Sequence, residues 1–186
     1  TRRSSDLKAD KKLASGEAVL RLIVDLRASN WLLHQLEGDT QTLTGASSFQ
    51  HVVVGEGEEL LVSGEDLVSA FYLFAMPPAW APFMTLAKPI PGRLVGRPEE
   101  EWSFVGLAVL PMGWHSSVGI MQAAHRRLAL GSPLRGAAGL SRLAEISRTA
   151  VFPSLEEEAG WSIYLDDTTI LERVSAKAAA DLEGKP

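Results

Sequence analysis

The chain of 186 residues contains no cysteine, which excludes a disulfide-stapled fold, a thiolate metal site and a thiol nucleophile. It contains only four histidines, and their scattered positions do not match a zinc-binding pattern: His34, His51, His115 and His125. No apolar run approaches the roughly 18–20 residues that span a bilayer, and no signal peptide is visible. These absences favour a protein of the cell interior, cytoplasmic or nuclear, that has no membrane partner.

The composition is that of an ordinary globular protein, with 46% hydrophobic and 22% charged residues. The length fits one domain, or one domain with a small appendage. The formal net charge of −5 argues against a protein that coats nucleic acid with a generally basic surface.

The charge alternates in blocks along the chain. Residues 1–27 carry a net charge of +3, residues 28–66 carry −7, residues 121–150 carry +4 and residues 151–186 carry −5. A cation-binding centre flanked by phosphate-binding surfaces has this pattern, because metal ions and polyanions need opposite charges at neighbouring places. Solvated charged faces have it as well.

The hydrophobic pattern predicts short strands and helices in alternation. Strands are expected at 18–25, 49–54, 60–63, 102–110, 161–165 and 168–171, and helices at 117–130, 140–146 and 172–182. Residues 75–98 hold six of the ten prolines and are expected to be irregular. Without long parallel βαβ units, the pattern favours an α+β fold with an antiparallel sheet packed on helices.

Adjacent carboxylates stand at the turn of the expected hairpin of residues 161–171. Asp166 and Asp167 separate two apolar runs, and they are either turn formers or ligands. Like charges at close range disfavour ionisation of both groups unless a cation binds. Asp66 follows another apolar run, and three carboxylates meeting at strand ends would suit Mg²⁺ or Mn²⁺.

Four segments in order resemble those of reverse transcriptases of retroviruses and retrotransposons. They are Arg21-Leu-Ile-Val-Asp-Leu-Arg-Ala-Ser-Asn30, Asp66-Leu-Val-Ser-Ala-Phe71, Leu110-Pro-Met-Gly-Trp-His-Ser-Ser117 with Gln122, and Tyr164-Leu-Asp-Asp167. The first is similar to the fingers segment of the family and the others to its motifs A, B and C. The likeness covers roughly residues 18–172 and implies a polymerase palm with partial fingers.

The resemblance implies two-metal nucleotidyl transfer. Asp66 and Asp166 would hold two Mg²⁺ ions, with Asp167 assisting and the backbone carbonyl of Leu67 as a further ligand. One ion would activate the primer 3′-hydroxyl, and the other would bind the triphosphate and stabilise the leaving pyrophosphate.

The resemblance also assigns residues to the incoming nucleotide. Arg21 would pair with the triphosphate, and Lys12 or Lys11 would supply a companion cation. Phe71 matches the aromatic gate that excludes a ribose 2′-hydroxyl, although a core aromatic is the alternative for this position. Two residues of the motif B bend complete the set: Met112 and Gly113.

Further residues are expected to contact the template and primer. Trp114 follows Gly113 in the bend that passes under the nascent base pair, and helix 117–130 would lie behind the template. Gln122 on this helix is either structural or functional. The cations expected to contact phosphates are Arg27, Arg126 and Arg127, together with Arg21, Arg135 and Arg142.

The sequence departs from the family pattern in several places. Met112 stands where many relatives carry glutamine, and Val118 replaces a common proline. Residues 131–158 are expected to form an inserted loop, because 41 residues separate Gln122 from Tyr164. Residues 1–60 would be mainly fingers and 61–186 mainly palm, and the 19 residues after Asp167 are too few for a thumb.

The expected function is therefore RNA-directed DNA synthesis by a retroelement-derived polymerase fragment. Its cofactor would be Mg²⁺ or Mn²⁺, and its partners an RNA or DNA template–primer and deoxynucleoside triphosphates. The alternative is a catalytically silent or domesticated copy that binds nucleic acid or a protein. An RNA-templated RNA polymerase is disfavoured by Phe71. The sequence leaves the oligomeric state and the parent element open.

Overall fold

The computed structural model describes residues 11–12, 18–19, 24–131, 140, 143–150 and 159–183. The strands are β1 (Lys11–Lys12), β2 (Ala18–Val19), β3 (Glu58–Asp66), β4 (Ile90–Pro91), β5 (Trp102–Ser103), β6 (Ala144–Glu145), β7 (Ala159–Tyr164) and β8 (Asp167–Ser175). The α-helices are α1 (Arg27–Leu32), α2 (Ser117–Gly131) and α3 (Ala176–Glu183). The 3₁₀ helices are η1 (Thr40–Thr42), η2 (Ala46–Phe49), η3 (Ala70–Leu73), η4 (Pro78–Met84) and η5 (Gly92–Val95).

The fold is α+β, and the chain forms two compact units. The first, here called the Trp114 unit, comprises Thr1–Gln35 and Ser69–Ser117. The second, here called the sheet unit, comprises Leu36–Val68 and Val118–Pro186. Each unit is built from two separate stretches of sequence.

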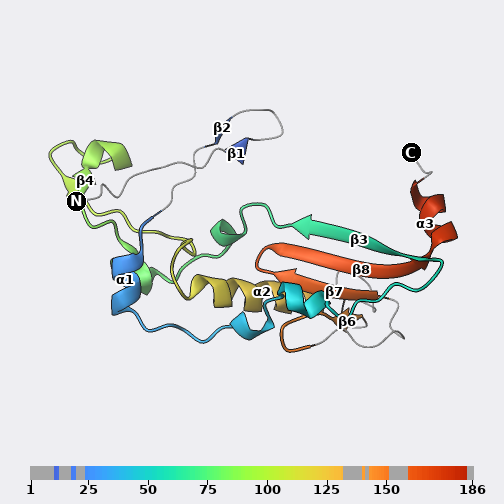
Figure 1. Cartoon of the computed structure of the whole chain (residues 1–186). Coiled ribbons are helices and arrows are strands. Elements are labelled where there is room, and N and C mark those ends of the chain that lie inside the picture. The colour runs from blue at the N-terminus through green and yellow to red at the C-terminus, as the bar shows by residue number, and fades with distance from the viewer. Residues whose placement is uncertain are drawn as a thin grey trace, which may run out of the picture. The chain divides into compact units, whose positions relative to one another are not determined.

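The sheet unit contains four strands in the order β3-β8-β7-β6 (Figure 1). Strands β3, β8 and β7 pair antiparallel, as expected, but β6 pairs parallel to β7, so the sheet is mixed. The expected helix at 140–146 is wrong at its C-terminal end, because Ala144–Glu145 form β6. The Ile146 N–H donates to Trp161 O at 2.7 Å, and the Ile146 side chain is buried, so pairing with β7 and burial outweigh local helix propensity.

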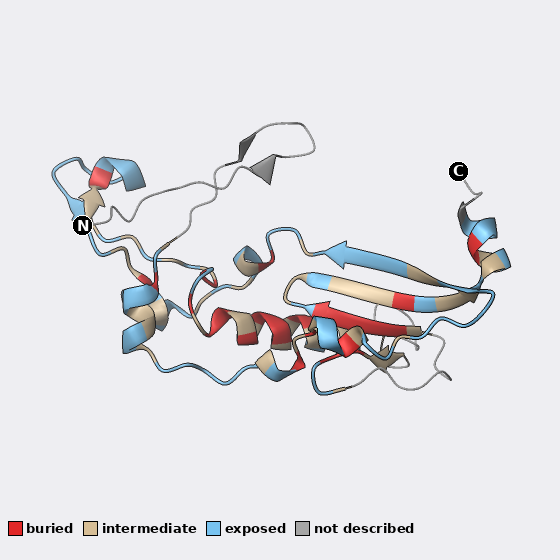
Figure 2. Ribbon diagram, in the orientation of Figure 1, coloured by how far each residue is buried: buried red, intermediate tan, exposed pale blue. Residues whose placement is uncertain are grey.

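Burial distinguishes the central strand β7 from the edge strand β3 (Figure 2). Strand β7 is buried from Gly160 to Ile163, whereas β3 is mostly exposed and carries four acidic residues, which protect an edge strand from pairing with other chains. Ile146 and Leu171 form a core cluster against which Phe49, Val52 and Leu60 pack. The expected strand at 49–54 is therefore wrong: η2 ends at Phe49, and these residues contribute side chains rather than a ladder.

Helix α2 confirms the prediction of a helix at 117–130. Met121, Gln122 and His125 are buried, whereas Leu128 is 61% exposed. The hydroxyl of Ser117, at the start of α2, donates to Pro111 O at 2.6 Å.

The Trp114 unit is largely irregular, as its prolines predict. Its buried hydrophobic residues include Leu26, Ala70, Met84, Leu110 and Trp114. The strand expected at 102–110 is reduced to β5, and the rest pairs only through single bridges at Gly106 and Val109. The strand expected at 18–25 begins with β2, but Asp25 already lies in the irregular segment before α1.

Within the described ranges, none of the helices has both the length and the apolar character needed to cross a lipid bilayer.

Candidate metal centre

Three carboxylates from two separated segments meet at one end of the sheet. Asp66 is the last residue of β3, and the register places it directly opposite Asp167, the first residue of β8. The Leu67 N–H donates to Asp166 O at 3.0 Å, which extends this pairing by one bond. One carboxylate oxygen from each of Asp66, Asp166 and Asp167 lies within 4.8 Å of the others. The structure thus brings together the three aspartates that the sequence singled out.

The turn that presents Asp166 is a two-residue connection between β7 and β8. Tyr164 pairs with Asp167, which leaves Leu165 and Asp166 as the central residues. Leu165 has a φ of +58°, a left-handed conformation that glycine adopts readily and a leucine rarely does. Two-residue hairpin loops favour positive φ at their first central position, because their twist then matches that of the strands. Such backbone strain persists only where the surroundings enforce it.

Gln122 of α2 supplies part of that enforcement. Its Oε1 accepts the Leu165 N–H at 2.9 Å, and its Nε2 donates to Ile163 O at 2.9 Å and to the Thr42 hydroxyl at 3.3 Å. The side chain is only 1% exposed. Gln122 therefore has a structural role: it joins α2 to the end of β7 and to the turn.

His125, one helical turn further along α2, reaches the backbone carbonyl of the same residue, Leu165. Its Nδ1 lies 2.8 Å from Leu165 O, and its Nε2 lies 3.1 Å from the Thr168 hydroxyl. The sequence pattern did not single out this histidine as a site residue. The signal was available in the three-residue spacing of Gln122 and His125, which puts both polar side chains on one face of a helix.

The donor set fits a hard divalent cation. Carboxylate oxygens are the ligands that Mg²⁺ and Mn²⁺ prefer, and here they converge from different segments rather than lying along one solvated strand. Asp66 and Asp167 are exposed and Asp166 is half-buried, so the cluster is open to a cation and to a substrate from solvent. Like charges directly opposite in an antiparallel pair are destabilising, and a bound cation would offset that repulsion.

The residues assigned to the incoming nucleotide belong to the Trp114 unit. Phe71 lies half-buried in η3, and Met112 is 37% exposed. Gly113 has a φ of +93°, and Asn30 braces this bend: its Nδ2 donates to Gly113 O at 2.9 Å, and its Oδ1 accepts the His115 N–H at 3.0 Å. The positive φ explains why glycine stands there.

Trp114 does not have the exposed side chain that a contact with nucleic acid requires. It is only 2% exposed, and its ring packs edge-on against Trp80 with centroids 5.4 Å apart. The expected nucleic-acid contact of this side chain is corrected accordingly. Trp114 is a core residue, because burial of its large apolar ring stabilises the unit.

Arg126 is also committed to the fold. Its guanidinium donates two hydrogen bonds of 2.6 Å to Glu145 and one of 3.1 Å to Asp39. These bonds, first of all those to Glu145, raise the pKa of Arg126 above its ordinary value. The expected phosphate contact of Arg126 is therefore corrected to an ion pair that ties β6 and the segment before η1 to α2.

Arg127 and Arg27 remain on the surface. Arg127 is exposed beside Arg126. Arg27 is exposed and pairs with Asp25 at 2.6 Å, and its side-chain hydrogen bonds lower the pKa of Asp25 to about 2. An exposed pair of this kind exchanges readily with solvent ions, so both arginines stay candidates for phosphate contact.

Several predicted residues lie outside the described residues: Arg21, Arg135 and Arg142. For Lys11 and Lys12 only the backbone, in β1, is described. Of the expected insertion at 131–158, the structure describes Gly131, Leu140 and residues 143–150, which include β6.

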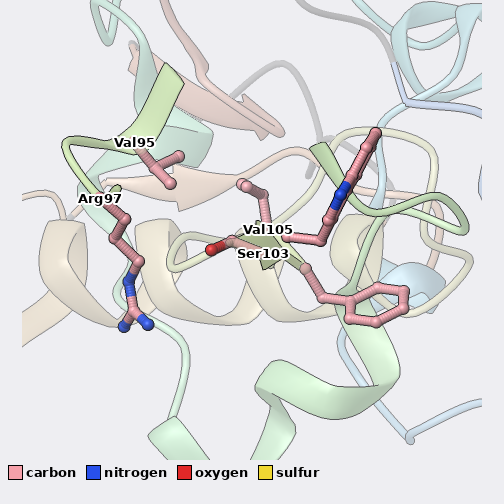
Figure 3. Close-up of a pocket in the computed structure, with 6 residues that line it drawn as sticks. Val95, Arg97, Ser103 and Val105 are labelled. Atoms are coloured by element: carbon pink, nitrogen blue, oxygen red, sulfur yellow. The ribbon is translucent and has the colours of Figure 1, made fainter. Parts of the chain in front are cut away.

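A surface pocket of about 460 Å³ lies in the Trp114 unit (Figure 3). Its lining combines apolar and polar side chains: Val95, Arg97, Trp102, Ser103, Phe104 and Val105. Nη1 of Arg97 lies 3.7 Å from Oε2 of Glu101. The residues that line the pocket include no carboxylate and no histidine. The pocket therefore lacks the groups for acid–base or metal chemistry, and the aspartate cluster is the stronger candidate for a functional site.

Neither a scan against models of known protein families nor a search of curated proteins finds a match to this chain.

Proposed function

We propose that this chain is a template-directed DNA polymerase of the reverse-transcriptase type, with its three catalytic aspartates in the sheet unit. The observation that carries the proposal is the convergence of Asp66, Asp166 and Asp167. They come from strands about 100 residues apart in sequence, and their oxygens lie within 4.8 Å. Motif resemblance alone names three aspartates, and only folding can bring them to one place.

The three carboxylates and the carbonyl of Leu67 would hold Mg²⁺ or Mn²⁺. When bound, the metal supplies Lewis-acid stabilisation of the attacking and leaving oxygens in nucleotidyl transfer. The protein's own contribution is placement. The β3–β8 register sets Asp66 opposite Asp167, and Gln122 fixes the turn that carries Asp166. Phosphoryl transfer depends mainly on such positioning and electrostatics.

The partners follow from the same proposal. The substrates are deoxynucleoside triphosphates and an RNA or DNA template–primer, with Phe71 excluding ribonucleotides and Arg21 and Lys12 at the triphosphate. Arg27 and Arg127 contact phosphates. These are intracellular substrates, which places the protein in the cytoplasm or nucleus.

Metal-dependent primer extension tests the proposal. Oligo(dT) annealed to poly(rA) is incubated with the chain, dTTP and Mg²⁺ or Mn²⁺, and extended products are resolved on a gel. Thermal unfolding with and without metal is measured in parallel, because a cation bound to the folded state raises its melting temperature. Asp166→Asn should lower extension at least a hundredfold, since even partners outside the ligand shell matter by about 10–100-fold.

Asp181→Asn is the matched control, because it removes one exposed carboxylate on α3 outside the aspartate cluster. It should retain both the metal shift and the extension. Equal metal shifts in the wild type and in the Asp66→Asn/Asp166→Asn variant would refute the shared metal site. The silent alternative is a chain that binds primer–template, with log K falling linearly against log salt, but extends nothing in either metal.

A further inference from the structure

One residue beside the metal centre, Leu165, is held by α2 through both its backbone N–H and its backbone carbonyl. Gln122 accepts the N–H of Leu165 at 2.9 Å, and His125 lies 2.8 Å from its carbonyl oxygen. This is the residue with the left-handed φ of +58°, directly before Asp166. A leucine keeps that conformation only where neighbouring groups select it, and here the neighbours are two side chains of one helix.

The hydrogen-bond chemistry defines the histidine. A carbonyl oxygen can only accept, so the proton facing Leu165 sits on Nδ1 of His125. The other ring nitrogen, Nε2, then faces the Thr168 hydroxyl at 3.1 Å, which donates to a neutral ring and accepts from a charged one. Both ends of the ring stay satisfied in either state. The ring is only 7% exposed, so water does not replace these bonds readily.

The two contacts bracket the aspartate pair. Leu165 precedes Asp166, and Thr168 follows Asp167. The rigid imidazole of His125 bonds to both residues. It therefore sets the distance between Leu165, which lies just before the two carboxylates, and Thr168 of β8, which lies just after them. Gln122 secures the approach to the turn from β7, through its bonds to Ile163 O and to the Leu165 N–H.

We propose that His125 is a positioning residue for the metal centre: with Thr168 it holds the Leu165–Asp166 turn so that the carboxylates of Asp166 and Asp167 face Asp66. This inference rests on the proposed function, because the geometry it preserves is that of a metal site. His125 itself touches no ligand atom and acts through the backbone of Leu165 and the hydroxyl of Thr168.

Two measurements on the full chain test it: amide hydrogen exchange by NMR, and Mn²⁺ binding by titration calorimetry. His125→Ala should speed exchange at the amides of Leu165 and Asp166 at least tenfold relative to those of Trp161–Ile163. It should also weaken Mn²⁺ binding by about 10–100-fold, the usual effect of removing a group that orients a ligand. His125→Asn retains a donor near the place of Nδ1 and should recover part of both losses.

Thr168→Val removes only the hydroxyl partner at nearly constant shape, and it decides the question if His125→Ala does not fold. It should weaken Mn²⁺ binding severalfold. Leu128→Ala, an exposed change on the same helix, should alter neither measurement.

Unchanged exchange at the turn in His125→Ala would overturn the inference. Faster exchange with unchanged Mn²⁺ affinity would also overturn it, because the contacts of His125 with the turn would then have no influence on metal binding. If the wild type shows no Mn²⁺ binding that Asp66→Asn/Asp166→Asn abolishes, the proposed function fails. In that case the exchange comparison still decides whether His125 holds the turn.

Discussion

The seating of α2 against the segment before η1 depends on two glycines that face each other. A Cβ added to Gly119 would lie 2.9 Å from the Cα of Gly38 and 3.3 Å from the Thr40 methyl group. The Asp39 N–H donates to Gly119 O at 3.1 Å across the same contact. Since the nearest obstacle is backbone rather than a flexible side chain, Gly119→Ala must push the helix or the segment away.

Two opposing effects set the magnitude. Alanine is favoured over glycine inside a helix by about 0.5–1 kcal/mol. Overpacking of a tight contact costs about 1–3 kcal/mol. The clash prevails, so Gly119→Ala should lower the free energy of unfolding by about 1–2 kcal/mol. For a chain of this size that corresponds to a fall in melting temperature of roughly 2–8 °C.

Urea unfolding followed by circular dichroism measures this loss. The control is Gly131→Ala at the last residue of α2, where an added Cβ would meet nothing within 4 Å. That change should leave stability unaltered or slightly raised. Because α2 carries Gln122 and His125, Gly119→Ala should also speed amide exchange at Leu165. A Gly119→Ala chain as stable as the wild type would refute the reasoning, because the added methyl group would then fit beside Gly38 without cost.

Two further outcomes are expected. Phe71→Val should raise ribonucleotide incorporation at least tenfold relative to deoxyribonucleotide incorporation in primer extension, because a smaller side chain leaves room for a 2′-hydroxyl. A folded variant with unchanged discrimination would instead make Phe71 a core aromatic. Arg126→Gln should lower the free energy of unfolding in urea by about 1–3 kcal/mol, because Asp39 and Glu145 lose their cation in a half-buried place. A fall in primer–template affinity at unchanged stability would return Arg126 to the phosphate-binding surface.

Local pattern determined the elements that depend on neighbours in sequence. Helix α2 was predictable because its backbone bonds close within four residues and its apolar spacing repeats over four turns. The β7–β8 hairpin was predictable for a similar reason, since two apolar runs separated by a polar pair leave few other ways to pair. These elements pointed to Asp166 and Asp167 as the tip of a turn, one residue later than the Leu165–Asp166 turn of the structure, in which Asp167 already belongs to β8.

Only the tertiary structure decided which groups those elements meet. Arg126 looks like any cation of a basic segment until folding brings Glu145 and Asp39 to it, and Trp114 looks like a contact residue until Trp80 packs on it. The same holds for His125, whose partners lie 40 and 43 residues away in sequence. Contacts at such separations depend both on the register of the strands and on where the helix packs. A short stretch of sequence specifies neither of these. Periodicity therefore predicts only approximately which side of a helix is buried. The bonds of Gln122 and His125 to the turn between β7 and β8 explain why the buried side of α2 carries polar residues.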